Sequence, residues 1–362
     1  MTSYSSRRAL LRAAGAAALA IPAGAMAPRA FAPADPLAFD PSVICRAVAA
    51  SGTAAAAAPG PRRKLKLTWN ANAICTVGVP VAATQGMFER HNLDVEMINF
   101  GGSTDQLLEA IATGKADAGV GMALRWLKPL EQGFDVKITA ATHGGCLRLL
   151  TLPDSGIRTI ADLKGKTLGA SDMAAPDKNF FSILAAKQGL DLNRDLTWRQ
   201  FPADLLSEAL KRGDIQAFAL SDPLASIIRD RDGLYEVANN VQGEYAQRAC
   251  CVLGIRGSLI RQDRAAARAL TAALLEAQDW VHANPDAAAE VFAPYSARAS
   301  VPALAAMLRS HTHGHHPMGA ALEQELAAYI EELKIVNVIR PSTNPARLAA
   351  RIHVDVLSGG AA

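Results

Sequence analysis

The sequence is poor in aromatic residues and lacks the short motifs of the commonest catalytic folds. Phe, Trp and Tyr make up 5% of the 362 residues, so the core must be mostly aliphatic. The chain contains no P-loop, no G-x-G-x-x-G fingerprint and no G-x-S-x-G elbow. With 50% apolar and 20% charged residues, the composition excludes a disordered or collagen-like chain, and the length favours two domains.

Acidic residues are absent from the first 32 positions, and this distorts the net charge. The formal charge of +3 includes four arginines from that segment, which are Arg7, Arg8, Arg12 and Arg29. Without them, 33 basic side chains face 34 acidic ones, and no long Lys/Arg run follows. The body of the chain therefore lacks the positive surface that a nucleic-acid-binding protein needs.

The N-terminus has the pattern of an export signal. Arg7-Arg8 precedes a short apolar stretch over 13–20, which is typical of a twin-arginine signal peptide. A membrane anchor is the alternative, but a span needs about 20 apolar residues and Pro22 interrupts this run. We predict a signal peptide over 1–32, cleaved after Ala25 or Ala32, and a flexible Ala/Pro-rich leader over 33–63. The expected location is the periplasm.

Cysteine is scarce, and its count is odd. The five residues are Cys45, Cys75, Cys146, Cys250 and Cys251. In an oxidising compartment at most two pairs can form, and the sequence does not say which. A bond between the adjacent Cys250 and Cys251 would strain the backbone.

From residue 64, short apolar runs alternate with segments of helical length. The expected strands are 65–69, 95–98, 116–120, 136–140, 147–152, 167–170, 197–201, 216–220 and 250–255. The expected helices are 77–90, 104–113, a segment ending at 132, 176–188, 203–211, 223–229 and most of 258–356. This rhythm predicts an α/β fold with mostly parallel sheets covered by helices on both faces.

The αβ pattern forms two sets of similar size, which predicts two lobes. We expect lobe 1 to comprise 64–146 and 250–356, with the C-terminal helices packed on it, and lobe 2 to comprise 147–249. The chain would cross between the lobes near 146–152 and again near 244–250. Ligands of such lobes bind at the carboxyl ends of the strands, so a ligand cleft is expected between them.

Three stretches carry a resemblance to a known family. Residues 79–96, which include Gln85-Gly86-Met87-Phe88, the Gly-x-x-Asp turn at 114–117, and Asp162-Leu163-Lys164-Gly165-Lys166 are similar to segments of nitrate/sulfonate/taurine-type solute-binding proteins of the NMT1/THI5-like superfamily. The resemblance implies a type II periplasmic-binding-protein fold that closes on a small solute. It also implies delivery of that solute to the permease of an ABC importer in the inner membrane.

Polar and glycine residues that follow the expected strands are the candidate ligand contacts. Glycines admit a ligand close to the backbone, helix N-termini present free N–H groups to an anion, and amide or hydroxyl side chains hydrogen-bond a polar solute. The candidates are Asn70, Asn72, Gly102, Ser103, Thr104, Met122, His143, Gly144, Cys146, Ser171, Asp172, Ser221 and Asp222. Helix capping and turn chemistry explain many of the same residues, Asp222 and Ser103 above all.

A metal or metal-chelate site is an alternative interpretation of the histidines and cysteines. Four of the eight histidines lie in the tract His311–His316. The candidate ligands are His143, Cys146, Cys250, Cys251, His315 and His316. The sequence has no tight CxxC spacing, so a solvated loop explains the tract equally well.

An enzyme related to the thiamine-pyrimidine synthases of the same superfamily is a second alternative. That resemblance implies a cysteine-rich iron motif, but Cys250-Cys251 supplies fewer cysteines than the motif has, and the first loop contains no lysine. We therefore expect a monomeric binding protein without a cofactor or catalytic residues. Its partners would be the small solute and the permease.

Overall fold

The computed structural model describes residues 61–100, 104–296 and 298–358. The predicted signal peptide, most of the predicted leader, Cys45, Gly102 and Ser103 lie outside these ranges. The first strand begins at Arg63, the last residue of the predicted leader. Among the described residues, no helix is both long and apolar enough to cross a bilayer.

Sheet A contains the strands at the two ends of the described chain. Its order is β2-β1-β3-β10-β4, and β1 pairs in parallel with both β2 and β3. The bounds are β1 (Arg63–Trp69), β2 (Leu93–Asn99), β3 (Ala118–Met122), β4 (Val136–His143) and β10 (Cys251–Arg256). Strand β10 is antiparallel to β3 and β4, between which it lies.

Sheet B is formed by the middle of the chain. Its order is β7-β6-β8-β5-β9, with β6 parallel to β7 and β8, and β5 antiparallel to β8 and β9. The bounds are β5 (Leu147–Thr151), β6 (Lys166–Ala170), β7 (Leu196–Gln200), β8 (Ala217–Ser221) and β9 (Tyr235–Asn239). We call the part built around sheet A lobe 1 and the part built around sheet B lobe 2.

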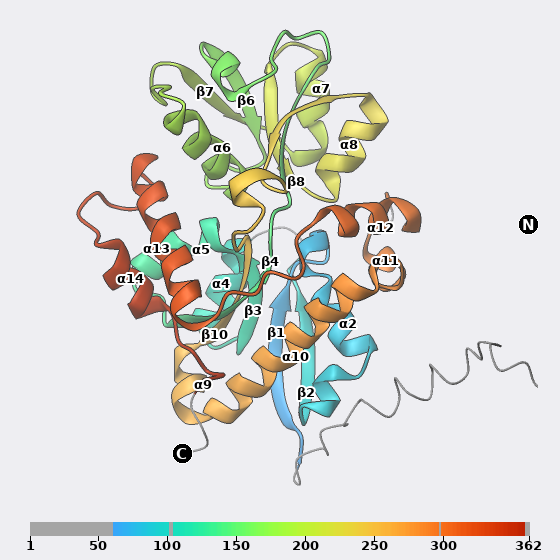
Figure 1. The fold of residues 1–362 in the computed structure, drawn as a ribbon, viewed down its shortest axis with the longest axis vertical. Helices are drawn as coiled ribbons and strands as arrows, with labels where there is room; N and C mark the ends of the chain where they lie inside the picture. The colour runs from blue at the N-terminus through green and yellow to red at the C-terminus, as the bar shows by residue number, and fades with distance from the viewer. Residues whose placement is uncertain (1–60, 101–103, 297, 359–362) are drawn as a thin grey trace, which may run out of the picture. The chain divides into compact units, whose positions relative to one another are not determined.

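The antiparallel strand of each sheet is the first strand after the chain crosses between lobes. Strand β5 follows β4 after three residues and runs in the same direction as β4. Strand β10 is likewise the first strand after the second crossing, and it continues in the direction of β9. The other strands of both sheets therefore end on the side from which the chain crosses. Figure 1 shows β4 leading from the lower sheet towards the upper one. The carboxyl ends of these strands meet where the two lobes adjoin.

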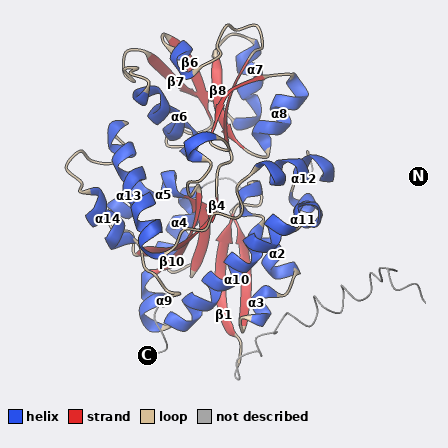
Figure 2. Cartoon of the chain, in the orientation of Figure 1, coloured by secondary structure: helices blue, strands red, loops and turns tan. Residues whose placement is uncertain are grey.

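Helices cover both sheets, as Figures 1 and 2 show. In lobe 2, α6 (Pro176–Lys187) lies on one side of the sheet, and α7 (Leu206–Lys211) and α8 (Leu224–Asp232) lie on the other. In lobe 1, α10 packs with α2 and α3, and α4 and α5 contact β3. Their bounds are α2 (Gly78–Thr84), α3 (Met87–Arg90), α4 (Thr104–Ala112), α5 (Ala123–Glu131) and α10 (Arg264–Ala283).

The C-terminal region is helical, as predicted. Its further helices are α9 (Gly257–Gln262), α11 (Pro285–Phe292), α12 (Val301–Ser310), α13 (Gly319–Ile335) and α14 (Pro345–Ile352). Short 3₁₀ turns occur as η1 (Ile74–Thr76), η2 (Ile160–Leu163), η3 (Ala203–Leu205), η4 (Gly243–Tyr245) and η5 (Ala293–Tyr295). Helix α10 packs on α2, α11 and α12, and α13 packs on α5, α6 and α14.

Two predictions of local structure were wrong. The helix expected over 77–90 is broken into α2 and α3, because Gly86 adopts a left-handed conformation with φ of 66°. Strand β9 was not predicted, since Tyr235–Asn239 is short and mixes polar with apolar residues. The other predicted strands are confirmed within a few residues.

The two crossing segments lie side by side. Asn240, which follows β9, accepts a hydrogen bond from the backbone N–H of Leu147 at 2.7 Å and donates from its own backbone N–H to the Leu147 carbonyl at 3.2 Å. A Cβ at Gly145 would lie 1.9 Å from the carbonyl oxygen of Asn240, so only glycine permits this approach. The backbone N–H of Cys250 donates to the carbonyl of His143. The junction between the lobes is therefore a pair of hydrogen-bonded segments.

Glu131, at the end of α5, fixes the segment between α13 and α14. Its carboxylate accepts hydrogen bonds from Lys128 Nζ at 2.9 Å, from the backbone N–H of Arg340 at 3.1 Å and from the hydroxyl of Thr343. Burial alone would raise the pKa of Glu131, but these hydrogen bonds outweigh it and hold the pKa at about 2.

This depressed pKa gives the protein a specific acid sensitivity. The folded state keeps Glu131 ionised below the pH at which an unfolded Glu protonates, near 4.3. Its stabilisation is therefore complete above that pH and is lost as the pH falls towards 2. We expect the free energy of unfolding to fall between pH 4 and 2 more steeply in wild type than in Glu131→Gln, by up to about 1.4 kcal/mol per pH unit. Urea unfolding at several pH values measures this, and the exposed Glu331→Gln should follow wild type. Parallel curves for wild type and Glu131→Gln would contradict the prediction.

Candidate functional site

A cavity of about 160 Å³ lies where the strand ends of the two lobes meet. Lobe 1 contributes Asn70, directly after β1, and Met122, the last residue of β3. Lobe 2 contributes Ser171, directly after β6, and Ser221, the last residue of β8. The cavity thus has the position at which α/β sheets bind ligands, at the carboxyl ends of their strands.

A second cavity, of about 490 Å³, shares part of this lining. Asn70, Ser171 and Ser221 border both cavities, so we treat them as one interlobe cleft. The second cavity extends past Asn72 to a segment near the C-terminal side of α11. That segment contributes Tyr295, Ser296 and Arg298.

Arg125 places a positive charge in the cleft. Helix α5 starts immediately after β3, so Arg125 lies in its first turn, next to the strand end. Its guanidinium donates to the carboxylate of Asp172 at 3.1 Å. Arg125 belongs to lobe 1 and Asp172 to lobe 2, so this ion pair joins the two sides of the cleft.

Asp177 is a buried carboxyl in the wall of the same cleft. It lies in the first turn of α6, and its carboxylate accepts a hydrogen bond from the backbone N–H of Lys178 at 2.7 Å. Burial raises the pKa of Asp177 to about 6, and the negative charge of Asp172 adds to the shift. The cleft therefore combines two arginines, Arg125 and Arg298, with acidic groups, amides and hydroxyls, which suits a small polar solute.

Four buried thiols form a ring at the junction of the lobes. The sulfur atoms of Cys146 and Cys250, one from each crossing segment, are 3.9 Å apart. The thiol of Cys75, in η1, lies against those of Cys146 and Cys251, and Cys250 lies against Cys251. Hydrogen bonds to Cys250 and Cys75, together with burial, raise the pKa of Cys146 and Cys251 well above the ordinary value. Cys75 and Cys251 also line the cleft.

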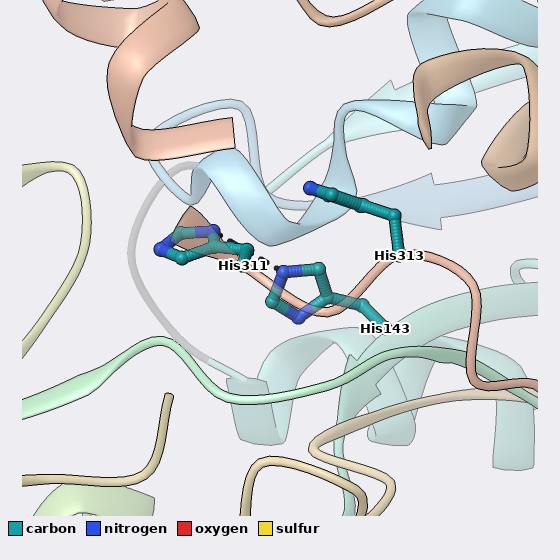
Figure 3. Close-up of side chains that lie close together, drawn as sticks. All are labelled: His143, His311 and His313. Atoms are coloured by element: carbon teal, nitrogen blue, oxygen red, sulfur yellow. Dashed lines mark hydrogen bonds between the residues drawn. The ribbon is translucent and has the colours of Figure 1, made fainter. Parts of the chain in front are cut away.

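Three histidines converge beside this junction, as Figure 3 shows. His143 is the last residue of β4, and His311 and His313 follow α12. His143 Nε2 is 3.3 Å from His311 Nδ1, and one ring nitrogen of each residue lies within 4.8 Å of the others. Burial, followed by the neighbouring histidines, lowers the pKa of His143 and lowers that of His313 to about 3. All three side chains are buried.

Asp222 lies in a buried ion pair rather than in the cleft. Its carboxylate accepts hydrogen bonds from Arg148 Nε at 2.9 and 3.0 Å, from His311 Nε2 at 2.8 Å and from the hydroxyl of Ser226 at 2.7 Å. Burial would raise its pKa, but His311 and Arg148 hold the pKa well below the usual range. The carboxylate also accepts a hydrogen bond at 3.1 Å from the backbone N–H of Ser226, in the first turn of α8, which agrees with the alternative that Asp222 caps this helix.

The predicted ligand contacts separate into two groups. Residues that line the cleft are Asn70, Asn72, Met122, Ser171, Asp172 and Ser221. His143, Gly144, Cys146 and Asp222 line neither cavity, because each is buried among partners of its own. Thr104 is the first residue of α4.

The histidines that lie together in the structure differ from the ligands predicted for the alternative metal site. Among the described residues, His143 is grouped with His311 and His313. His315 instead pairs with Glu325 at 2.8 Å, and His316 lies 3.6 Å from Asp279. Cys146 belongs to the thiol ring.

Sequence reasoning missed several residues of the cleft. Arg125 and Asp177 could have been found, because each lies in the first turn of a helix near a strand end, which is the argument that indicated Ser171. Tyr295 and Arg298 could not be found in this way, since they lie in the C-terminal helical region and follow no predicted strand.

This architecture, two αβ sheets whose strand ends enclose a cleft, is that of the periplasmic binding proteins. The chain is similar to the periplasmic aliphatic sulphonate binding protein SsuA from Escherichia coli, with a TM-score of 0.70 and 16% identity over 83% of this chain and 95% of that one. It is also similar to the periplasmic nitrate-binding protein NrtA from Synechocystis PCC 6803, with a TM-score of 0.66 and 13% identity over 82% of this chain and 87% of that one. The predicted fold is confirmed.

Residues 75–288 match the family model described as NMT1/THI5 like, and the chain belongs to this family. A curated relative from Brucella abortus, named "Putative binding protein", is 24% identical over 217 residues. The match covers 59% of this chain and 66% of the relative, so the chain spans just under two thirds of the curated relatives' length. The resemblance seen in the sequence is confirmed.

Proposed function

We propose that this protein is the solute-binding protein of an ABC importer and captures a small anionic or polar organic solute in the interlobe cleft. The observation that carries the proposal is the Arg125–Asp172 pair, which already joins a guanidinium of lobe 1 to a carboxylate of lobe 2 across the cleft. An incoming sulfonate or carboxylate replaces Asp172 at the guanidinium and exchanges one charge-assisted hydrogen bond for another. The similarity to SsuA and NrtA, a sulphonate-binding and a nitrate-binding protein, supports the same ligand class.

The proposal has further parts, and the export route among them rests on the arginine pair Arg7-Arg8 of the sequence. The protein is exported by the twin-arginine route, acts in the periplasm as a monomer and presents its closed form to a permease in the inner membrane. Lobe 2 moves against lobe 1 at the paired crossing segments. The solute is released unchanged, so no residue of the cleft has a catalytic part.

The proposal is tested by unfolding the protein in the presence of candidate solutes. Nitrate, bicarbonate, alkanesulfonates, aminosulfonates, amino acids and pyrimidines are the panel. A solute at one hundred times its Kd should raise the free energy of unfolding by about 2.7 kcal/mol. Absence of stabilisation by the whole panel, or conversion of any member into a product, would contradict the proposal.

Arg125→Met is expected to weaken binding of the identified anion by about 10- to 100-fold, because a hydrogen bond to a charged group contributes about 1.5–3 kcal/mol. Isothermal titration measures the change. Arg347→Met, which removes an exposed arginine from α14, is the matched control and should bind like wild type. Equal affinity in Arg125→Met and wild type would remove Arg125 from the site.

A further inference from the structure

The three buried histidines are arranged as the ligands of a metal ion. We propose that His143, His311 and His313 bind one divalent first-row transition-metal ion at the junction of the lobes, through His143 Nε2, His311 Nδ1 and His313 Nε2. This site lies outside the interlobe cleft and does not depend on the solute that the cleft binds. Figure 3 shows the three side chains close together, and one ring nitrogen of each lies within 4.8 Å of the others although the two segments are distant in the sequence.

The second ring nitrogen identifies the ligand atom of two of these residues. His311 Nε2 is 2.8 Å from the Asp222 carboxylate, and His313 Nδ1 is 3.3 Å from Gln278 Oε1. Each oxygen accepts a hydrogen bond, so the proton lies on that nitrogen and the lone pair lies on the other. Metal-binding histidines in proteins are held by carboxylate or carbonyl oxygens in this way.

Without an ion, the polar atoms of the cluster are poorly satisfied. Among the described residues, His313 Nε2 has no hydrogen-bond partner, although the residue is only 1% exposed. If His143 Nε2 donates to His311 Nδ1, then His143 Nδ1 carries the lone pair, and that atom also has no partner. Buried polar atoms are paired in almost all folded proteins, so these two need an explanation. An ion accepts the lone pairs of all three rings and so pairs His313 Nε2, whereas His143 Nδ1 then carries the proton and finds no acceptor among the described residues.

The donor set defines the class of ion. Three neutral imidazoles suit Zn²⁺, Co²⁺, Ni²⁺ or Cu²⁺ and do not suit Ca²⁺ or Mg²⁺, which require oxygen ligands. Three protein ligands leave a fourth position of a tetrahedral ion for water. The carboxylate of Asp222 places a negative charge beside His311 Nε2, and the guanidinium of Arg148 neutralises that charge.

A bound ion would join three parts of the fold. His143 ends β4 at the first crossing, and the backbone N–H of Gly144 donates to the carbonyl of Thr312 at 2.8 Å. His311 and His313 belong to the segment after α12, and Asp222 belongs to lobe 2. The ion therefore holds the segment after α12 against the first crossing segment. This place adjoins the paired crossing segments at which lobe 2 moves in the proposed function.

The test is metal binding by the chelator-stripped protein. Wild type should bind one Zn²⁺ per chain in isothermal titration, and His313→Gln should weaken binding by more than about 100-fold, since loss of an outer partner alone costs 10- to 100-fold. His315→Gln removes a histidine from the same tract that pairs with Glu325, outside the three-histidine cluster, and it should bind Zn²⁺ like wild type. Circular dichroism of each metal-free variant verifies the fold.

Co²⁺ distinguishes the histidines from the neighbouring thiols. Ligation by imidazoles gives visible d–d bands without a sulfur-to-metal charge-transfer band in the near ultraviolet, and Cys250→Ser should leave the spectrum unchanged. Three results would each overturn the proposal: no saturable Zn²⁺ binding by wild type, equal losses in His315→Gln and His313→Gln, or a charge-transfer band that disappears in Cys250→Ser.

Discussion

Replacing Arg148 with methionine is expected to lower the free energy of unfolding by about 3–5 kcal/mol, because it leaves a buried carboxylate without its counter-charge. The Arg148 side chain is 6% exposed and that of Asp222 is 0% exposed, and they form an ion pair at 2.8 Å. Methionine keeps most of the length and apolar volume of the arginine. The loss is therefore electrostatic, and urea unfolding at neutral pH measures it.

Two variants separate charge from packing at this pair. Arg212→Met removes an exposed arginine paired with Asp214, and it should cost less than about 1 kcal/mol. The double variant Arg148→Met/Asp222→Asn leaves no unpaired charge, so it should be more stable than Arg148→Met alone. If the double variant is the less stable of the two, the unpaired carboxylate of Asp222 is not what destabilises Arg148→Met.

Oxidation is expected to join Cys146 to Cys250 and Cys75 to Cys251. The sulfur atoms of Cys146 and Cys250 need to approach by about 2 Å to reach bonding distance. The bond would link positions 104 residues apart, and closing a loop of about 100 residues stabilises a fold by about 4.7 kcal/mol in the chain-entropy model. Mass spectrometry of a non-reduced digest identifies the pairs, and urea unfolding with and without reductant measures the stabilisation.

Serine variants provide the control for this pairing. Cys146→Ser should lose the first pair and keep the second, and Cys75→Ser should show the opposite pattern. The thiol ring places Cys75 opposite Cys250 and Cys146 opposite Cys251, so neither of these combinations should form. Their appearance, or four free thiols after oxidation, would contradict the prediction.

The sequence predicted features that arise from local patterns. Apolar runs marked the strands, and two of the residues that follow a strand, Asn70 and Ser171, line the cavity between the lobes. Gly86 was read as part of a helix, because periodicity does not reveal a backbone angle. The short strand β9 had too little pattern to be recognised.

Features that arise from contacts between residues far apart in the sequence could not be predicted. His143 and His311 are 168 positions apart, and nothing in the spacing shows that they meet or that His315 points to Glu325 instead. Asp222 looked like a cap or a ligand contact, because the sequence does not show that Arg148 needs a counter-charge at that point. The thiol ring likewise depends on the way in which the two crossings pair.

The position of β10 imposes an order on the assembly of the protein. Lobe 2 is one uninterrupted stretch of chain, so it has every strand it requires as soon as β9 has left the ribosome. Sheet A is different, because β10 must insert between β3 and β4, which are synthesised long before it. Until then, β3 and β4 each expose an unpaired edge. During N-to-C synthesis the second-made half of the molecule is therefore complete before the first-made half.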